Sequence, residues 1–467
     1  MSFIIYDLSF LVLFSLAVGI FLYVERKKLV REGPMFLYKT KIGLEVIEYF
    51  GKKFPKTLKA MSYVIVATGY ALMVSAIYFI FQILWMFSNP AVVKMVKVPP
   101  IMPLIPYIGE IFQASWLPPF YFTYWIVAIA LVAIFHEGFH GIFAKFNKIR
   151  IKSTGFGFLG PFLAFFVEQD DKQMQKAKIF PQLTVLAAGV FANVLLTIIF
   201  FLLLGGFFSA AYSQGGAIFN DYSYVVAPAS VLLNASVMNE TLTVRNVSFA
   251  KINLANNSFF VQGTLLNGNF TKDNQTLIKM YQDQPAIENQ VVGYITEING
   301  NKIRTNEDIV KQLADKKPGE TVTITTKLGN QTNTYEFALG ADYTNNSRAV
   351  IGIASYSGQQ AGHSLRVFIS NLIGKFQDPS VHYEPKMNAD FTTFIYYLIW
   401  WIFMINFSVA IANMLPLGIF DGGRFFYLTI LAITKKEKWA ENSFKWATWL
   451  LLAVIALMMV FYFIGIF

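Results

Sequence analysis

Residues 118–143 read PPFYFTYWIVAIALVAIFHEGFHGIF, and this run decides the fold class. A helix needs about 20 consecutive apolar residues to cross a bilayer, and this run exceeds that length. Four other runs also do so: residues 5–24, 62–87, 182–208 and 445–467. A sixth run, 392–415, is interrupted by Asn406 and Asn413 but is long enough. The sequence therefore predicts a polytopic α-helical membrane protein with about six transmembrane helices.

The composition supports a membrane protein and excludes other classes. Of 467 residues, 55% are hydrophobic and only 14% are charged, whereas soluble proteins carry about 25% charged residues. The net charge of +10 is concentrated beside the apolar runs, where loop topology explains it, so we expect no nucleic-acid partner. The absence of cysteine excludes disulfides and thiolate sites. We expect the first run to be retained as an anchor, because no basic segment precedes it.

Lysine and arginine predict the orientation of the spans. They gather in residues 25–60, 144–181 and 434–444, and the positive-inside rule places these three loops in the cytoplasm. Both termini and the large polar segment 209–390 then lie outside. Eight Asn-x-Ser/Thr patterns fall within that segment, which favours an exported and glycosylated region. We expect an integral multi-pass protein of the cell membrane.

The run at 118–143 also carries the strongest chemical motif. His136 and His140 are four residues apart, so they share one face of a helix and could bind one zinc ion. Glu137 is placed to accept a proton from zinc-bound water. Ionisable groups within an apolar span are expensive, at about 2.5–3.5 kcal/mol for an acid, and so indicate function. The alternative is a helix end that exits at the interface with its histidines solvated.

A third ligand is predicted after the sixth run, in NMLPLGIFDGGR. A catalytic zinc commonly has three protein ligands, and Asp421 falls on the same predicted side of the membrane as the histidines. Pro416 and Gly418 break the helix there, and irregular backbone at membrane depth is tolerated where it lines a cavity. The alternative is that Asp421 serves only a turn, since Asp-Gly-Gly is a strong turn signal.

These motifs together resemble the site-2 protease family of intramembrane metalloproteases. The first is HExxH at 136–140, and the second is Asn-x-x-Pro-x-x-x-x-Asp-Gly at 413–422. Gly189 and Asn193 resemble the family's Gly-x-x-x-Asn span. A membrane-associated hairpin at about 150–168 resembles the family's hairpin and ends in Ala164, Phe165 and Glu168. Phe166 is an extra residue relative to the family pattern of this hairpin.

The resemblance implies a role for each matched residue. His136, His140 and Asp421 would bind Zn²⁺, and Glu137 would be the general base and later the acid. Asn193 and Asn413 would bind substrate or support the transition state, although asparagines in spans also serve simple interhelical hydrogen bonds. The hairpin, with Phe165 and Glu168, would hold an unwound substrate as an added strand.

The segment between the motif halves contains a second resemblance. Residues 294–325, YITEINGNKIRTNEDIVKQLADKKPGETVTIT, resemble a PDZ domain of the kind attached to proteases, with Gly293-Tyr294 in place of the usual Gly-Asp. We therefore expect an inserted soluble domain of α+β or β-rich structure that includes this PDZ-like module and binds a peptide. The predicted parts are 1–208, the first half of the membrane core; 209–290, an insert of unknown fold; 291–355, the PDZ-like domain; 356–390, a linker; and 391–467, the second half of the core.

The function expected from this resemblance is hydrolysis of peptide bonds within or near transmembrane segments, in regulated intramembrane proteolysis. The expected partners are transmembrane protein substrates, the lipid bilayer and a peptide ligand of the PDZ-like domain. Three alternatives remain at this stage. The first is an HExxH membrane protease of the prenyl-protein or quality-control type, which takes a downstream Glu as ligand. The second is a non-catalytic PDZ-containing scaffold, and the third is a transporter.

Overall fold

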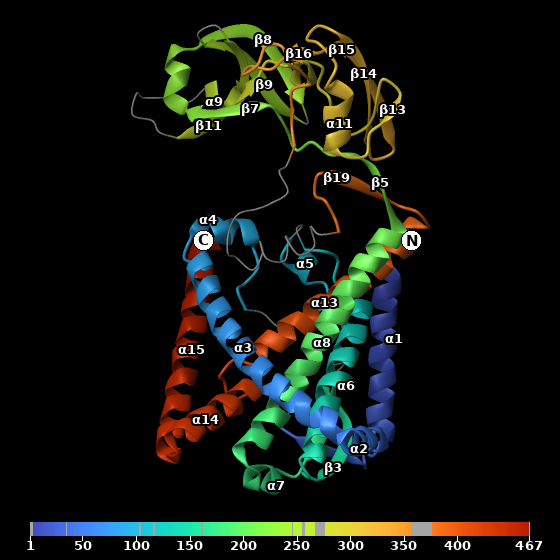
Figure 1. Cartoon of the computed structure of the whole chain (residues 1–467), viewed down its shortest axis with the longest axis vertical. Helices are drawn as coiled ribbons and strands as arrows, with labels where there is room; N and C mark the ends of the chain where they lie inside the picture. The colour runs from blue at the N-terminus through green and yellow to red at the C-terminus, as the bar shows by residue number, and fades with distance from the viewer. Residues whose placement is uncertain are drawn as a thin grey trace. The chain divides into compact units, whose positions relative to one another are not determined.

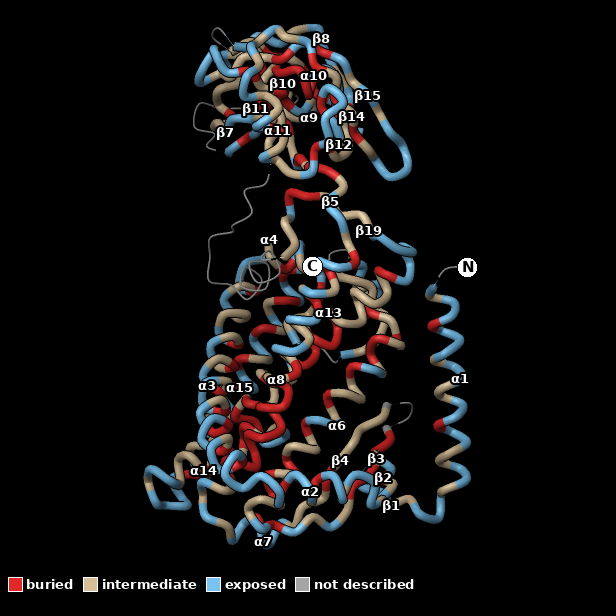
Figure 2. Tube along the Cα trace, turned by 45° about the vertical axis from the view of Figure 1, so that its right-hand side comes forward, coloured by how far each residue is buried: buried red, intermediate tan, exposed pale blue. Residues whose placement is uncertain are grey.

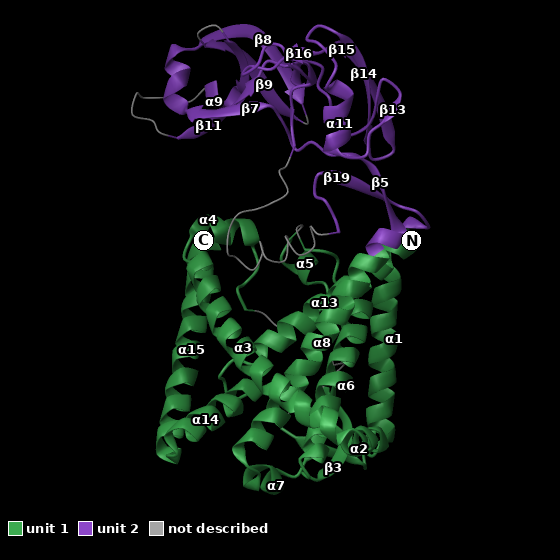
Figure 3. Ribbon diagram, in the orientation of Figure 1, with its two compact units in different colours: residues 1–207, 390–467 green, residues 208–389 purple. Residues whose placement is uncertain are grey.

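The computed structural model divides the chain into two compact units (Figure 3). Unit 1 comprises residues 1–207 and 390–467, and unit 2 comprises residues 208–389. The structure describes residues 3–33, 35–101, 104–114, 117–159, 162–244, 246–254, 257–266, 276–355 and 376–466. The predicted linker at 356–390 therefore lies partly outside the described residues.

Unit 1 contains six helices that are long and apolar enough to cross a membrane, counted among the described residues (Figure 1). They are α1 (Phe3–Val24), α3 (Pro55–Phe87), α6 (Phe122–Phe146), α8 (Ile179–Ala211), α13 (Ala389–Ala412) and α15 (Glu437–Ile466). Shorter helices are α2 (Leu44–Lys53), α4 (Pro90–Val96), α5 (Ile108–Ile111), α7 (Asp171–Lys176) and α14 (Asp421–Thr434). The prediction of six long apolar helices is thus confirmed.

Helix α8 is the central helix of unit 1 and α1 is the most peripheral of the long helices. Figure 2 shows buried residues concentrated along α8 and exposed residues along most of α1. Side chains of α8 pack with those of α3, α6 and α14 in one apolar cluster, in which Phe425 of α14 is fully buried. Gly69 of α3 allows this packing, because a Cβ there would lie 3.0 Å from Ala187 and 3.1 Å from the Phe425 ring.

A buried carboxylate fastens α1 to the start of α6. Asp7 accepts hydrogen bonds from the backbone N–H groups of Phe122 (2.7 Å) and Thr123 (2.9 Å), and from the hydroxyl groups of Tyr107 and Thr123. The first N–H groups of a helix have no partner within it, and a negative charge at that end is favourable. Asp7 therefore caps α6 from another helix, and the side chain of Tyr121 at the N-cap position makes no capping hydrogen bond.

The predicted hairpin is part of a four-stranded antiparallel sheet. Its strands are β1 (Leu29–Glu32), β2 (Met35–Thr40), β3 (Ile151–Leu159) and β4 (Phe162–Gln169), in the order β1-β2-β3-β4. Phe166 pairs with Gly155, and a Cβ on Gly155 would lie 2.6 Å from the Phe166 ring. A glycine at 155 thus makes room for the extra phenylalanine. Among the described strands, β4 pairs with β3 alone, so no strand pairs with its other edge.

Unit 2 is built from two main sheets that share one apolar core. The first sheet has the order β7-β11-β10-β9-β8, and the second has the order β15-β14-β12-β5-β19 with β13 paired to β12. The strands are β5 (Tyr212–Ala217), β6 (Asp221–Tyr222), β7 (Tyr224–Pro228), β8 (Ser236–Val244), β9 (Val247–Leu254), β10 (Asn257–Gln262), β11 (Leu277–Gln282), β12 (Tyr294–Ile298), β13 (Asn301–Lys302), β14 (Thr321–Leu328), β15 (Gln331–Ala338), β16 (Gly340–Ala341), β17 (Ala349–Val350), β18 (Ile353–Ala354) and β19 (Val381–Pro385). Phe249 and Phe260 of the first sheet lie in one cluster with Ile295 and Ile324 of the second.

The helices of unit 2 are short. They are the 3₁₀ helix η1 (Ala229–Asn234), α9 (Gly263–Leu266), α10 (Pro285–Glu288) and α11 (Asn306–Leu313). Thr305 is the N-cap of α11 and forms a capping box with Asp308, which satisfies two backbone N–H groups at the helix start.

Candidate metal centre

Three potential ligands meet inside unit 1. His136 and His140 lie one helical turn apart on α6, and Asp421 is the first residue of α14. The two Nε2 atoms are 3.1 Å apart, and each lies 3.3 Å from Oδ2 of Asp421. Both imidazoles are buried. Among the described residues, this is the group of histidine and carboxylate side chains that could hold a metal ion.

The spacing of these three atoms fits a zinc ion. Zinc bonds nitrogen and oxygen at about 2.0–2.2 Å in a tetrahedron, whose corners are then about 3.3 Å apart. The three measured separations of 3.1–3.3 Å match that edge length. In the described part of the chain no fourth histidine, cysteine or carboxylate side chain joins these three, and three protein ligands are typical of catalytic rather than structural zinc sites. Two neutral imidazoles and one carboxylate are a donor set that zinc accepts.

Each imidazole is oriented by a partner on α8. Nδ1 of His140 lies 2.7 Å from the carbonyl oxygen of Val185, so Nδ1–H donates there and Nε2 keeps its lone pair for a metal. Nδ1 of His136 lies 3.0 Å from Nδ2 of Asn193, while the buried Oδ1 of Asn193 has no partner. Metal binding at Nε2 of His136 requires a proton on Nδ1. With the amide N and O of Asn193 exchanged, Oδ1 accepts the hydrogen bond from Nδ1–H.

Gly189 creates the space for the ligands. A Cβ built at Gly189 would collide with Nε2 of His140 and lie 2.7 Å from Nε2 of His136. The same atom would therefore intrude on the point at which the two nitrogens converge. Gly189 and Asn193 are four residues apart on α8, so both face the same side of that helix. One glycine makes room for the imidazoles, and the asparagine orients one of them.

The second motif folds tightly so that Asp421 can begin α14. The N–H of Gly422 donates to the carbonyl oxygen of Asn413 (2.8 Å), which draws the loop back on itself. A Cβ on Gly422 would lie 2.6 Å from the carbonyl oxygen of Leu415 and would collide with the backbone of Met414. Glycine is thus required after the aspartate for a reason of space. The sequence Asp-Gly-Gly serves both as a turn and as the source of a potential ligand.

Glu137 lies between α6 and the hairpin. Its Oε2 accepts a hydrogen bond from the backbone N–H of Val167 on β4 (3.1 Å). The other carboxylate oxygen makes no hydrogen bond within the described part of the chain. Because β4 is the edge strand of its sheet, this N–H belongs to the free edge. The structure therefore brings the expected base next to the edge of β4.

The other residues expected at the site from the sequence differ in the contacts that their side chains make. Phe165 is on β4 in edge-to-face contact with Phe156 of β3, on the face of the sheet shared with Val167. Glu168 is on the opposite face, where its carboxylate accepts from Lys39 Nζ (2.8 Å) and Ser153 Oγ (2.6 Å). These contacts hold the pKa of Glu168 below its usual range and tie three strands together. Asn413 is half-buried, and its side chain makes no hydrogen bond among the described residues.

Two groups at the site could not have been found from the sequence. The carbonyl of Val185 and the N–H of Val167 are backbone groups, and every residue other than proline carries both kinds. No type of amino acid in a sequence therefore identifies these two backbone groups. Gly189 and Asn193, in contrast, carry a readable signal as a small residue and an amide four positions apart in an apolar span.

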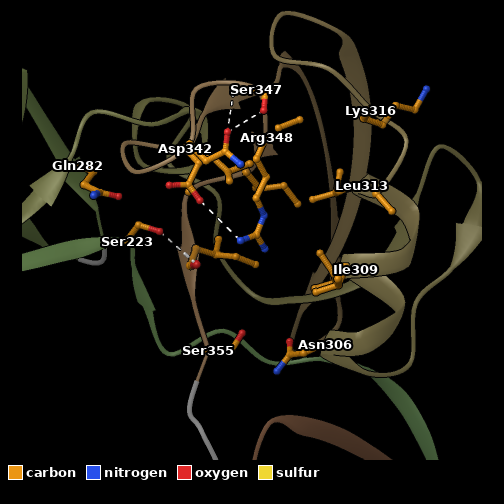
Figure 4. A pocket seen from close by; sticks show the side chains of 18 residues that line it. Ser223, Gln282, Asn306, Ile309, Leu313, Lys316, Asp342, Ser347, Arg348 and Ser355 are labelled. Carbon is orange, nitrogen blue, oxygen red and sulfur yellow. Dashed lines mark hydrogen bonds and ion pairs between the residues drawn. The ribbon is translucent and has the colours of Figure 1, made fainter.

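Unit 2 contains a separate cavity of about 730 Å³ (Figure 4). Helix α11 contributes Ile309 and Leu313 to one wall, and the segment around β17 and β18 contributes the other. Arg348 lies at this cavity and pairs with Asp342 at 3.7 Å.

Comparison with known proteins identifies the family. A family model for Peptidase family M50 matches residues 124–460, and the chain belongs to this family, that of the site-2 proteases. The resemblance inferred from the motifs is thereby confirmed. Family membership makes the chain a metallopeptidase, and together with the six long apolar helices it indicates an integral membrane protein.

A solved structure is similar to a small part of the chain. It is the PDZ domain of an SdrC-like protein from Listeria monocytogenes, with 33% sequence identity and a TM-score of 0.14. The match covers 15% of this chain and 75% of that one. No curated protein matches the chain.

Proposed function

We propose that this metallopeptidase is a zinc-dependent intramembrane protease that hydrolyses peptide bonds within or near transmembrane segments. The observation that carries the proposal is the triangle of His136, His140 and Asp421, whose ligand atoms have the spacing of a tetrahedral zinc site. Two of the three ligands lie on an apolar helix long enough to span a membrane. A water-consuming reaction at that depth needs a site that activates water locally, and zinc with an adjacent carboxylate does so.

Each residue of the site has a distinct task. His136, His140 and Asp421 would hold the zinc, which when bound supplies a Lewis acid and lowers the pKa of water to about 7. Water adds to the scissile carbonyl carbon, and the C–N bond breaks. Glu137 moves one proton from that water to the departing nitrogen, which is general base and then general acid catalysis.

The free edge of β4 is the proposed binding surface for the scissile segment. A peptide bond in a helix is shielded by its own hydrogen bonds, so the substrate must become extended before attack. An edge strand offers unpaired backbone groups to an extended chain. The N–H of Val167 belongs to this edge and already contacts Glu137, so a strand added there would pass beside the base. We assign Glu168 to holding the sheet together, because its carboxylate is engaged on the opposite face.

The proposal predicts that cleavage depends on a tightly held metal. The purified chain in lipid vesicles should cut a single-span reporter, a zinc chelator should stop the cleavage, and one equivalent of added zinc should restore it. The measurement is the cleaved fraction together with the zinc content per chain. Cleavage that continues without metal, or a chain that retains none, would exclude this function and favour the scaffold alternative.

We further propose that Asn193 orients His136 rather than the substrate. Replacing Asn193 with Ala should lower zinc affinity about 10- to 100-fold, as does loss of other groups that orient metal ligands. Asn193→Asp keeps an acceptor for Nδ1–H and should retain both zinc and cleavage. The control is Asn406→Ala on α13, since the side-chain amide of buried Asn406 donates to the carbonyl oxygen of Ile402 in its own helix. A direct role on the substrate would instead leave zinc affinity intact in Asn193→Ala and abolish cleavage in Asn193→Asp.

The orientation expected from the basic loops is retained as part of the proposal. The metal centre would then lie towards the cytoplasmic side of the cell membrane and unit 2 outside. Single cysteines introduced into the loops of this cysteine-free chain would measure that orientation by their labelling from either side.

A further inference from the structure

A small apolar cavity lies between α6 and the hairpin. Its volume is about 40 Å³, and every described residue that lines it is apolar. Helix α6 contributes Ile129, Ala130 and Ala133, and strand β4 contributes Leu163 and Phe165. The cavity therefore begins about one helical turn before His136 and continues towards the start of α6.

The cavity lies in the layer between one face of the sheet and α6. Antiparallel pairing places Val167, Phe165 and Leu163 opposite Thr154, Phe156 and Phe158 of β3, so these side chains share a face. Val167 on this face packs against α6, since its Cγ1 is 3.3 Å from the position of a Cβ on Gly141. Phe165 and Leu163 point into the same layer nearer the hairpin tip. The cavity is thus a gap left in an otherwise packed interface.

The backbone of these residues faces the free edge. Val167 directs its N–H away from β3, towards Glu137. Backbone groups alternate in direction along a strand, so Phe165 and Leu163 have the same edge orientation as Val167. A strand added to this edge would carry alternate side chains into the layer that holds the cavity. The layer would thus receive every second side chain of such a strand.

We propose that this cavity is a specificity subsite that accepts one apolar side chain of the substrate, two to four residues from the bond that is cut. This distance from the cut bond follows from the spacing along β4. Val167 contacts Glu137, and the cavity residues Phe165 and Leu163 precede Val167 by two and four residues. The subsite rests on the proposed proteolysis and defines its sequence preference. Its size favours a small aliphatic side chain over an aromatic one.

Ala130 and Ala133 keep the cavity open. They are the smallest side chains on the α6 side, and their neighbours along the helix include Ile126, Ile129 and Ile134. A leucine at 133 would add three carbon atoms where the volume is only about 40 Å³. Conversely, shortening Leu163 on β4 would enlarge the cavity from the opposite wall. A substitution on α6 can therefore reduce the cavity volume, and a substitution on β4 can increase it.

The test is a panel of single-span reporters read as kcat/KM. Gly, Ala, Val, Leu or Phe is placed in turn at each position within four residues of the cleaved bond. We expect wild type to discriminate against Phe at one of these positions. Ala133→Leu should shift the preference at that position towards Gly and Ala by about 10-fold or more, as expected for one or two methylenes in an apolar pocket. Leu163→Ala should allow Phe there, a gain that misfolding cannot produce.

The control is Val127→Leu, which changes an exposed residue of α6 that does not line the cavity. It should keep the wild-type ranking at every position. The subsite is refuted if Ala133→Leu and Leu163→Ala both keep that ranking while wild type cuts. A wild type that cuts no reporter and holds no zinc would instead overturn the proposed function itself.

Discussion

Replacing Glu137 with Gln is expected to abolish cleavage while leaving zinc bound. The amide keeps the shape of the side chain but cannot accept a proton, so the reaction loses its base and its acid together. General acid–base catalysis contributes about 10²–10⁴-fold, and we expect a loss of that size in kcat. Glu137 is not among the three potential metal ligands, so the zinc content should remain at one ion per chain.

This prediction is checked by measuring cleavage and zinc content on the same preparation. Glu45→Gln is the matched control, because it removes the same charge from an exposed position on α2. It should leave both quantities unchanged. If Glu137→Gln cuts at the wild-type rate, another group is the base. If the variant loses its zinc, Glu137 is part of the metal centre instead.

Gly189→Ala is expected to remove both zinc and activity with the addition of one methyl group. The new Cβ would collide with Nε2 of His140 and come within 2.7 Å of Nε2 of His136, the two atoms that would hold the metal. Alanine is favoured over glycine in a helix interior by about 1 kcal/mol, so the substitution should not weaken α8 as a helix. The effect should therefore be confined to the metal centre.

The same helix offers a matched control in Gly206. A Cβ at Gly206 meets no heavy atom within 4 Å, so Gly206→Ala makes the same chemical change in open space. We expect it to keep full zinc content and cleavage, measured by metal analysis and the reporter assay. A Gly189→Ala variant that still binds one zinc would show that the imidazoles converge elsewhere.

Most of the membrane fold could be predicted from the sequence because its signal is local. Apolar length alone locates the six long helices, and HExxH places two potential ligands on one helix face. Asp421 is 281 residues after His140 in the chain, and no local pattern joins them. Only the combination of two motifs predicted that they belong together.

What the sequence did not predict depends on long-range pairing. Strands β1 and β2 extend the hairpin to four strands, although they follow α1 and lie more than a hundred residues before β3. The five-stranded sheet within 209–290 was not predicted either, since its strands lack a clear alternation of polar and apolar residues. Asn193 and Asn413 looked equivalent as intramembrane amides, yet only Asn193 contacts a histidine in the structure.

The capping of α6 by Asp7 has a consequence for biosynthesis. Asp7 leaves the ribosome 115 residues before Phe122 and 116 residues before Thr123, whose N–H groups it accepts. Until the third long helix has been inserted, this carboxylate has none of those donors and must be solvated at the membrane surface. Helix α1 therefore cannot complete its contacts with α6 until that third long helix is in place, although α1 precedes it in the chain.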